Sequence, residues 1–387
     1  MGVSIKKLVY LILILSMFSL GHANNFVQLN SKLSSELFDS LYEESTNLLI
    51  SPYSISNSIL MLYMGTSSIN EYEIKHILNL QSEKGTICEL ASQIRKELLD
   101  YRLKNSMISY QTLWIHSPHK ISNDYLNIAK IQFGAEVESC DLANPKFFKA
   151  RHDEWVYQKT RKKIGKNFTT YEPRATTLAI MTDISTLKCL WKSSFPTKGN
   201  FQAPFFSSQG NINQEYMSQV GEFDFYEDEQ HSIVSLPMDN DLKFLAVLPK
   251  NNSYSLKNES ITSILKTKLT PSRIFIQLPK FSISKPQNLN HSLMSIGLIR
   301  LFSRGSDFTN ISQSGNLYLS DYLHQTHIAI NEWGIDGSSS LFSLSSRETQ
   351  SNETIQGQFI ANSTFLFLII DTKQDIVLFL GTYSTPG

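Results

Sequence analysis

Three side chains of this 387-residue chain could form a catalytic set, namely Ser51, His324 and Asp183. A serine nucleophile with a histidine base and an orienting carboxylate cleaves acyl bonds in many hydrolases. However, a chain of this composition always allows some such set to be chosen. The sequence has no Gly-x-Ser-x-Gly elbow, no His-Glu-x-x-His motif and no phosphate-binding glycine loop. Hydrolysis is therefore a weak hypothesis, and we do not expect an enzyme.

Metal and disulfide chemistry also lack a pattern. The nine histidines are scattered without the spacing of a metal site. An odd number of cysteines leaves at least one thiol unpaired or in an intermolecular bond. The sequence does not say whether any two of the three pair: Cys88, Cys140 and Cys189. We expect no metal and no other cofactor, and a core that is held together largely without disulfides.

The charges of the chain balance, with 35 basic and 35 acidic residues. No overall field would therefore recruit nucleic acid or an acidic membrane surface. The local run Arg161-Lys162-Lys163 is typical of a solvated helix end. Over residues 88–104 a glycosaminoglycan site has weak support, because acidic residues interrupt the basic ones and dilute the local field. The residues concerned are Arg95, Lys96, Glu97, Asp100, Arg102 and Lys104.

The first residues predict the compartment. Lys6-Lys7 precede an apolar run from Leu8 to Leu20, and Gly21-His22-Ala23 follows with small residues where signal peptidase needs them. The apolar run is too short for a permanent membrane anchor, and no later stretch approaches the length of a span. We expect residues 1–23 to be a secretory signal peptide. The mature chain is then an extracellular monomer that starts near Asn24.

Seven Asn-x-Ser/Thr sequons agree with secretion. Single triplets of this kind often arise by chance, but beside a signal sequence several of them are expected to carry glycans. The sequence does not say which. The seven asparagines are Asn167, Asn251, Asn258, Asn290, Asn310, Asn352 and Asn362.

Residues 24–387 indicate a single domain, because no Pro/Gly/Ser-rich linker and no internal repeat divides them. The first half is mainly helical in its spacing of apolar residues, and Asn70 resembles an N-cap. From about Thr176 onwards strands dominate. Helices mostly first and strands mostly later predict an α+β fold. The expected helical segments are residues 25–42, 54–63, 70–78 and 88–103.

The expected strands are often apolar on both faces, which is typical of buried strands. The last pair, around the turn 371–375, predicts a buried hairpin. The strand segments are residues 176–184, 232–236, 244–248, 273–278, 281–283, 317–319, 365–370 and 376–380.

Six stretches, taken in order and spacing, resemble the serpin family of serine protease inhibitors across essentially the whole mature chain. They are "NLLISPYSISNSILMLYMGT" (47–66), "WVYQKTRKKI" (155–164), Leu190-Trp191 followed by Phe195, "LPKFSI" (278–283), "LYLSDYLHQTHIAINEWG" (317–334) and "FLFLIIDTKQDIVLFLG" (365–381). The family's C-terminal signature appears as Thr364-Phe365-Leu366-Phe367 and Phe379-Leu380-Gly381, with the usual proline replaced. The resemblance implies one domain with three β-sheets, about nine helices and an exposed reactive-centre loop at about 335–358.

The resemblance also implies a mechanism. A protease attacks the loop and forms an acyl-enzyme, and the hinge half of the loop then inserts into the main sheet as an extra strand. Insertion carries the protease across the molecule and distorts its active site. In this family Glu-x-Gly, here Glu332-Trp333-Gly334, ends a central strand and starts the hinge. The inserting residues must be small, and those on the inward face must be uncharged.

The hinge of this chain is permissive without being typical. Family inhibitors favour Thr after the hinge glycine and then a run of Ala, whereas this chain has Ile335, Asp336, Gly337, Ser338, Ser339 and Ser340. The resemblance places Ile335, Gly337 and Ser339 inward, and none of them is charged. Asp336 falls outward. Gly337 weakens an inserted strand, so a loop that never inserts stays open as an alternative.

The family's usual spacing from Glu332 to the cut makes Glu348 the residue before the scissile bond, and a hinge one residue shorter makes it Arg347. An Arg side chain matches the carboxylate in the specificity pocket of a trypsin-like protease. We therefore expect cleavage at Arg347–Glu348, with Glu348–Thr349 as the second choice. Arg347 could also be only a solubilising loop charge.

A polar network under the main sheet, called the shutter in this family, matches Ser51, Ser54 and His324, with Asp183 where Asn is usual. We hypothesise that Asp183 pairs with His324, which would make sheet opening depend on pH. The alternative is that Asp183 bonds hydroxyls and backbone without a switching role. Trp191 is expected to pack at the top of the sheet. Cys189 takes a position usually held by Gly, for which we have no physical account.

Together these observations favour a secreted inhibitor of a trypsin-like serine protease that acts once per molecule as a suicide substrate. The main alternative is a non-inhibitory serpin, a binding, carrier or chaperone protein whose loop is cleaved without trapping the protease.

Overall fold

The computed structural model describes residues 26–117, 119–165, 171–250, 256–258, 260–338 and 354–386. In these ranges a first helix occupies residues 26–41, and seven further α-helices follow. They are α2 (Pro52–Gly65), α3 (Ser68–Ile77), α4 (Lys84–Arg95), α5 (Asn123–Ile128), α6 (Pro145–Lys159), α7 (Ile261–Lys266) and α8 (Asn290–Ser295). Helices α4 and α5 continue as π-helical turns, η1 (Lys96–Arg102) and η2 (Ala129–Phe133). Short 3-10 turns are η3 (Thr197–Gly199), η4 (Leu256–Asn258) and η5 (Ile299–Phe302).

Helix α2 lies in the middle of the molecule, and nearly all of its residues are buried. Ser51 caps it, because its hydroxyl accepts the Ser54 N–H at 3.3 Å, and Pro52 fits the first turn. The start predicted for the next helix is wrong. Ser67 is the N-cap of α3, so Asn70 lies inside the helix with its side chain buried.

The strands of the described ranges form two hydrogen-bonded networks. The seven-stranded network contains β2 (Met107–His116), β3 (Glu136–Cys140), β4 (Ala179–Leu187), β5 (Cys189–Leu190), β11 (Phe281–Asn288), β12 (Asp321–Asn331) and β13 (Gly334–Ile335). The nine-stranded network contains β1 (Leu48–Ile50), β6 (Phe201–Ser207), β7 (Gly210–Glu227), β8 (His231–Pro237), β9 (Leu242–Pro249), β10 (Thr270–Pro279), β14 (Gly357–Ile360), β15 (Phe365–Asp371) and β16 (Ile376–Tyr383).

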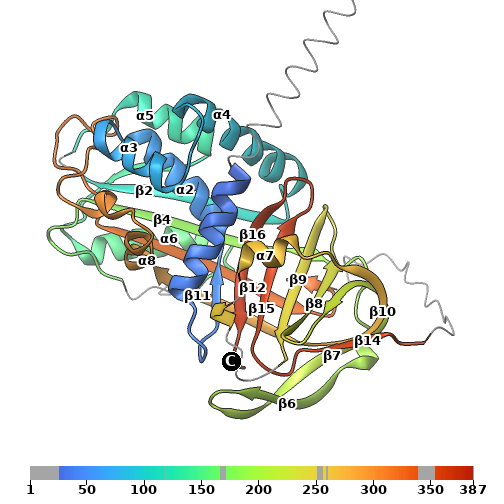
Figure 1. Ribbon diagram of the computed structural model, residues 1–387. Coiled ribbons are helices and arrows are strands. Elements are labelled where there is room, and N and C mark those ends of the chain that lie inside the picture. Colours follow the sequence, from blue (N-terminus) through green and yellow to red (C-terminus); the bar gives the residue numbers. More distant parts are fainter. Residues whose placement is uncertain are drawn as a thin grey trace, which may run out of the picture.

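The three expected sheets are present as two networks because strand β7 is shared. It has 18 residues and pairs with β6 at its start, with β10 along its middle and with β8 at its end. One long strand therefore joins what would otherwise be two smaller sheets. Figure 1 shows helices α2 to α5 gathered beside β2 and β4, whereas β6 to β10 make a strand-rich part of the molecule.

The predicted C-terminal hairpin is confirmed, since every residue of β15 and β16 is buried. The strand predicted at residues 317–319 is wrong. Leu317 and Leu319 are buried there, but the backbone forms no strand. Within the described residues no helix is both long and apolar enough to cross a membrane.

Candidate functional site: the hinge and the central strands

The centre of the seven-stranded network is a parallel pair, β4 and β12. Residues Ile180–Thr186 of β4 face Asp321–His327 of β12 through direct backbone pairing. Strands β2 and β3 continue the sheet beyond β4, and β11 pairs with the other edge of β12. Over this stretch the two central strands are in contact, with no strand between them.

Above that stretch, a tight hairpin follows β12. Asn331 Oδ1 accepts the Trp333 N–H at 2.9 Å, which stabilises the turn at Glu332-Trp333. The chain then reverses into β13, where Ile335 pairs with Ile330 of β12 and also with Cys189 of β5. The first two hinge residues thus already lie between the two central strands, since β5 directly follows β4.

The register of β13 agrees with that of the sheet. Ile335 pairs with both Ile330 and Cys189, and these two partners are 141 residues apart in the sequence. The direct pairing of His324 with Asp183 spans the same 141 residues. A strand that continued from β13 would therefore match both neighbours without any slippage between β4 and β12.

Gly334 is required where β13 begins. Its φ is +141°, a conformation that side chains rarely allow, and a Cβ would lie 2.1 Å from the Cys189 carbonyl oxygen. The expected role of the Glu-x-Gly sequence, ending a strand and starting the hinge, agrees with this geometry.

Glu332 is held in a network that sequence reasoning missed. Its carboxylate lies 2.9 Å from Lys280 Nζ, which also pairs with Glu215 at 3.0 Å, and the Asn200 amide donates to the same carboxylate. Burial would raise the pKa of Glu332, but its own backbone N–H together with Lys280 and Asn200 holds it below its ordinary value. Lys280 lies in the "LPKFSI" stretch, which contributes to the family resemblance, but nothing in the sequence indicated that it pairs with Glu332.

The residues after Ile335 are described as far as Ser338. Ile335 is fully buried, as expected for an inward position. The Asp336 side chain is 15% exposed and contacts Lys163 and His327. Its outward position refers to an inserted strand and stays a prediction. Asn331 Nδ2 donates to the Gly337 carbonyl at 3.0 Å. Outside the described residues lie Ser339, Ser340, Arg347, Glu348, Thr349 and Asn352.

The predicted shutter residues come together behind the sheet, and the predicted Asp183–His324 pairing is present. His324 Nδ1 contacts Asp183 Oδ1, and the Tyr322 hydroxyl donates to Asp183 Oδ2. His324 Nε2 accepts the Ser51 N–H at 3.0 Å. Because Nε2 accepts this bond, the ring nitrogen that can carry a proton is Nδ1, which faces Asp183. Burial and the Asp183 charge raise the pKa of Tyr322 well above its ordinary value, which keeps the phenol a donor.

The set Ser51, His324 and Asp183 does not have the geometry of a hydrolase triad. The Ser51 hydroxyl donates to the Leu378 carbonyl at 2.7 Å rather than to His324, and Ser51, His324 and Asp183 are completely buried. A nucleophile has to be hydrogen-bonded to its base and open to a substrate. Ser54 belongs to the same network, since its N–H donates to the Ser51 hydroxyl at 3.3 Å, and its own hydroxyl accepts from Gln111 Nε2 at 3.0 Å.

Trp191 packs at the top of the sheet as predicted. Its indole N–H donates to the Asn331 carbonyl at 2.9 Å, and its backbone N–H donates to the Trp333 carbonyl at 3.0 Å. The side chain is 1% exposed and lies edge-on to Phe244. Trp191 therefore clamps the turn from which the hinge starts.

The sequence model of one family, described as serpin (serine protease inhibitor), matches residues 28–386. The chain belongs to the serpin family. It is 26% identical to an uncharacterized serpin-like protein of Thermococcus kodakarensis, over 91% of this chain and 83% of that protein. It is 24% identical to the leukocyte elastase inhibitor of Xenopus laevis, over 91% of this chain and 97% of that protein. The solved structure of human thyroxine-binding globulin aligns with a TM-score of 0.81 at 20% identity, covering 93% and 99% of the two chains. The predicted serpin fold is confirmed.

All three cysteines of this serpin are free and buried, so none of them forms a disulfide. Burial raises the pKa of Cys88 to about 11 and that of Cys189 to about 12. Cys189 donates to the Asp239 carbonyl at 3.4 Å. The side chain is accommodated beside β13, although a glycine is usual here in the family.

Four of the seven sequons of the serpin lie in described segments. The Asn290 side chain takes part in the fold, since Nδ2 donates to the Ser320 carbonyl at 2.8 Å and to Asp321, and Oδ1 accepts the Tyr322 N–H. A glycan at Asn290 would have to replace one of those donors. Asn362 is half-buried, and Asn258 ends η4.

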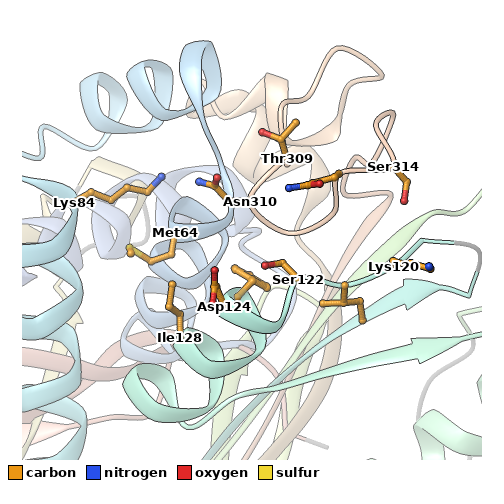
Figure 2. Close-up of a pocket in the computed structure, with 12 residues that line it drawn as sticks. Met64, Lys84, Lys120, Ser122, Asp124, Ile128, Thr309, Asn310 and Ser314 are labelled. Atoms are coloured by element: carbon orange, nitrogen blue, oxygen red, sulfur yellow. The ribbon is translucent and has the colours of Figure 1, made fainter.

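Asn310, the fourth of these sequon residues, lines a cavity of about 620 Å³. Figure 2 shows it there with Met64, Lys84 and Lys120. Asn310 Nδ2 donates to the Thr66 carbonyl at 2.8 Å, and Lys84 Nζ donates to the same carbonyl at 2.6 Å. The cavity is open to solvent. In the described residues no group of three or more His, Cys, Asp or Glu could hold a metal ion.

In the weakly supported glycosaminoglycan site of residues 88–104, two of the basic side chains form ion pairs within the protein. Arg95 pairs with Asp100 at 3.2 Å, and Arg102 pairs with the fully buried Asp371 and lies 3.5 Å from Glu97. Paired guanidinium groups add little to the local field that a polyanion would need.

Proposed function

We propose that this serpin is a secreted suicide inhibitor of a serine protease with trypsin-like specificity. The protease serine attacks the carbonyl carbon of Arg347. The bond to the nitrogen of Glu348 breaks, and the protease histidine returns the proton of the serine to the leaving amine. The product is an acyl-enzyme, with the protease bound through an ester to the new C-terminus of the hinge half. Insertion of that half into the sheet then traps the ester before water can cleave it.

The observation that supports this proposal best is the position of β13. Gly334 and Ile335 are already paired on both sides, in the register that a full inserted strand would have. Starting a strand is unfavourable because chain entropy is lost before contacts repay it. In this hinge the first pairs of the strand are already formed, so this entropy cost has been met. Below them β4 and β12 still pair directly, and the rest of the hinge would insert there.

The test is incubation with trypsin followed by denaturing electrophoresis. A covalent complex with the mass of both chains, and a free residue 348–387 fragment, are expected. Complete cleavage without a complex would reject inhibition. Thermal unfolding of the cleaved protein is the second readout, because an inserted strand raises Tm sharply whether or not a protease stays attached.

One observation favours the non-inhibitory alternative. The Asp183–His324 contact bridges β4 and β12, the two strands that insertion must separate, and both side chains are completely buried. Separating a buried charge from its partner is strongly unfavourable unless new partners replace it. If that barrier dominates, the loop is cleaved without inserting, and the protein serves as a binding or carrier module.

Secretion and glycosylation are part of the proposal and rest on residues 1–23 and on the sequons. Expression in a eukaryotic secretory system tests both. The mature chain should start near Asn24 and lose mass on deglycosylation.

A further inference from the structure

Asp336 follows β13 and marks the point at which the hinge leaves the sheet. Its N–H donates to the Ala329 carbonyl at 2.7 Å, so this residue is still aligned with β12. Its φ is +47°, in the left-handed region that few residues other than Gly, Asn and Asp adopt. A strand needs extended backbone and cannot continue through such a residue. The conformation of Asp336 therefore stops β13 after two residues.

Two basic side chains hold the Asp336 carboxylate. Lys163 Nζ pairs with Oδ2, and His327 Nε2 lies 3.8 Å from Oδ1. The Lys163 and His327 side chains are 28% and 17% exposed, so solvent screens these contacts less than it screens fully exposed pairs. Burial would raise the pKa of Asp336, but the contacts with His327 and Lys163 hold it below its ordinary value.

The position of Lys163 is set by its neighbours. The next residue, Ile164, is completely buried in a small cluster with Val156 of α6 and Ile184 of β4. Thr160 Oγ1 accepts the Ile164 N–H at 3.2 Å and donates to the Val156 carbonyl at 2.8 Å. The basic run after α6, which the sequence suggested was only a solvated helix end, thus connects α6 to the hinge.

We propose that Lys163 and His327 form a latch that restrains loop insertion by stabilising Asp336 in its left-handed conformation. The latch rests on the proposed insertion mechanism and adds a control to it. For β13 to lengthen, Asp336 must change to extended backbone. Without the two contacts, the Asp336 carboxylate no longer helps to offset the cost of its left-handed conformation. The hinge then inserts between β4 and β12 more readily.

The test measures insertion itself. Full-length protein with Ser338→Cys is labelled with an environment-sensitive dye, which is selective because the three native thiols are buried. The labelled protein is mixed with trypsin at saturating concentrations, at which adding more trypsin no longer speeds up the change in fluorescence. Under these conditions cleavage does not limit the rate, and the signal measures insertion. We expect Lys163→Met and Asp336→Asn to raise this limiting rate roughly fivefold, the effect of one partly exposed ion pair.

Two further variants sharpen the result. Asp336→Thr removes the charge and also disfavours the left-handed conformation, so it should insert fastest. Lys162→Met removes a positive charge from the same run. The Lys162 ammonium lies 5.9 Å from the Tyr157 ring centre rather than on Asp336, so its variant should match the wild type within about twofold.

A limiting rate for Lys163→Met that equals or falls below that of Lys162→Met overturns the latch. Should Lys163→Met fail to fold, which thermal unfolding of the uncleaved protein reveals, His327→Gln and Asp336→Asn carry the same test. If the wild type inserts normally and none of these variants differs from it, the latch alone is rejected. If the cleaved wild type shows no signal and no gain in Tm, the insertion mechanism fails and the latch fails with it.

Discussion

Lys280 Nζ lies 2.9 Å from Glu332 Oε1, at the turn where β12 reverses into the hinge. The Glu332 side chain is 9% exposed, and the Phe195 N–H donates to the Glu332 carbonyl at 3.0 Å. Side chain and backbone of Glu332 therefore fix the same turn. The position at which the loop leaves the sheet depends on this ion pair.

Glu332→Gln is expected to lower the free energy of unfolding by about 1–3 kcal/mol, because Lys280 keeps its charge while losing its main partner. Urea denaturation measures the change. Glu227→Gln is the matched control, since Glu227 pairs with Lys250 at 3.0 Å at a more exposed position and should change stability much less. Equal losses in the two variants would contradict the assigned role.

The Glu332 pair also predicts a pH dependence. The pKa of Glu332 is lowered in the folded protein from an ordinary value of 4.5. Its stabilising contribution is therefore fully present above that ordinary value and is lost as the pH falls through the lowered folded value. The stability difference between wild type and Glu332→Gln should shrink on acidification below pH 4.5 and stay constant between about pH 6 and 8. A difference that grows with acid would contradict this sign.

Gly334→Ala should destabilise the protein by about 2 kcal/mol or more, because the added methyl group meets the Cys189 carbonyl and the backbone conformation disfavours a side chain. Cys189 and Leu190 belong to β5, so the clash should also push β13 out of the sheet. Thermal unfolding and hydrogen exchange at residues 334–336 are the measurements. Gly85→Ala is the control, since nothing lies within 4 Å of its added methyl group. A Gly334→Ala variant with unchanged Tm and exchange would refute the close approach.

Asp183→Asn should ease the separation of β4 and β12, because it removes the charge from the contact that bridges them. We expect loop insertion and heat-induced polymerisation to become several-fold faster. Tyr322→Phe removes one donor to Asp183 and leaves His324 in place, so its effect should be smaller. Equal wild-type rates from mildly acidic to mildly alkaline pH would exclude a pH-controlled shutter.

Arg347→Ala should reduce the rate of complex formation with trypsin by about a hundredfold or more, because the charge pairing in the specificity pocket is lost. Glu348→Ala should have a small effect. Mass spectrometry of the cleaved loop identifies the bond directly. If the cleaved loop ends at Glu348 instead, the scissile bond is Glu348–Thr349 and trypsin-like specificity is rejected.

The sequence predicted those parts of the fold in which a local pattern matches the local structure. The apolar runs of β15 and β16 are buried on both faces, and both strands formed where expected. Strand β7 was missed because it is polar along much of its length and takes part in three different pairings. Leu317 and Leu319 alternate like a strand, but their burial comes from packing without pairing.

The candidate site shows the same division. The Asp183–His324 pairing could be predicted because the family resemblance placed both residues in one network. Lys163 and Asp336 are 173 residues apart, and no spacing rule connects them. The left-handed conformation of Asp336 was equally invisible, because Asp also tolerates the extended backbone that the inward–outward alternation assumed.

The matched registers of β13 and the central strands have a mechanical consequence. His324 lies six residues before Ile330 on β12, so an inserting chain reaches its level six residues after Ile335. Each residue advances the chain by about 3.3 Å, which makes this distance about 20 Å of travel. Because the neighbouring strands need not slide, each step can form its own backbone pairs before the next begins. Insertion would then be an irreversible movement that proceeds one residue at a time, and the left-handed conformation of Asp336 would hold the chain at its starting point.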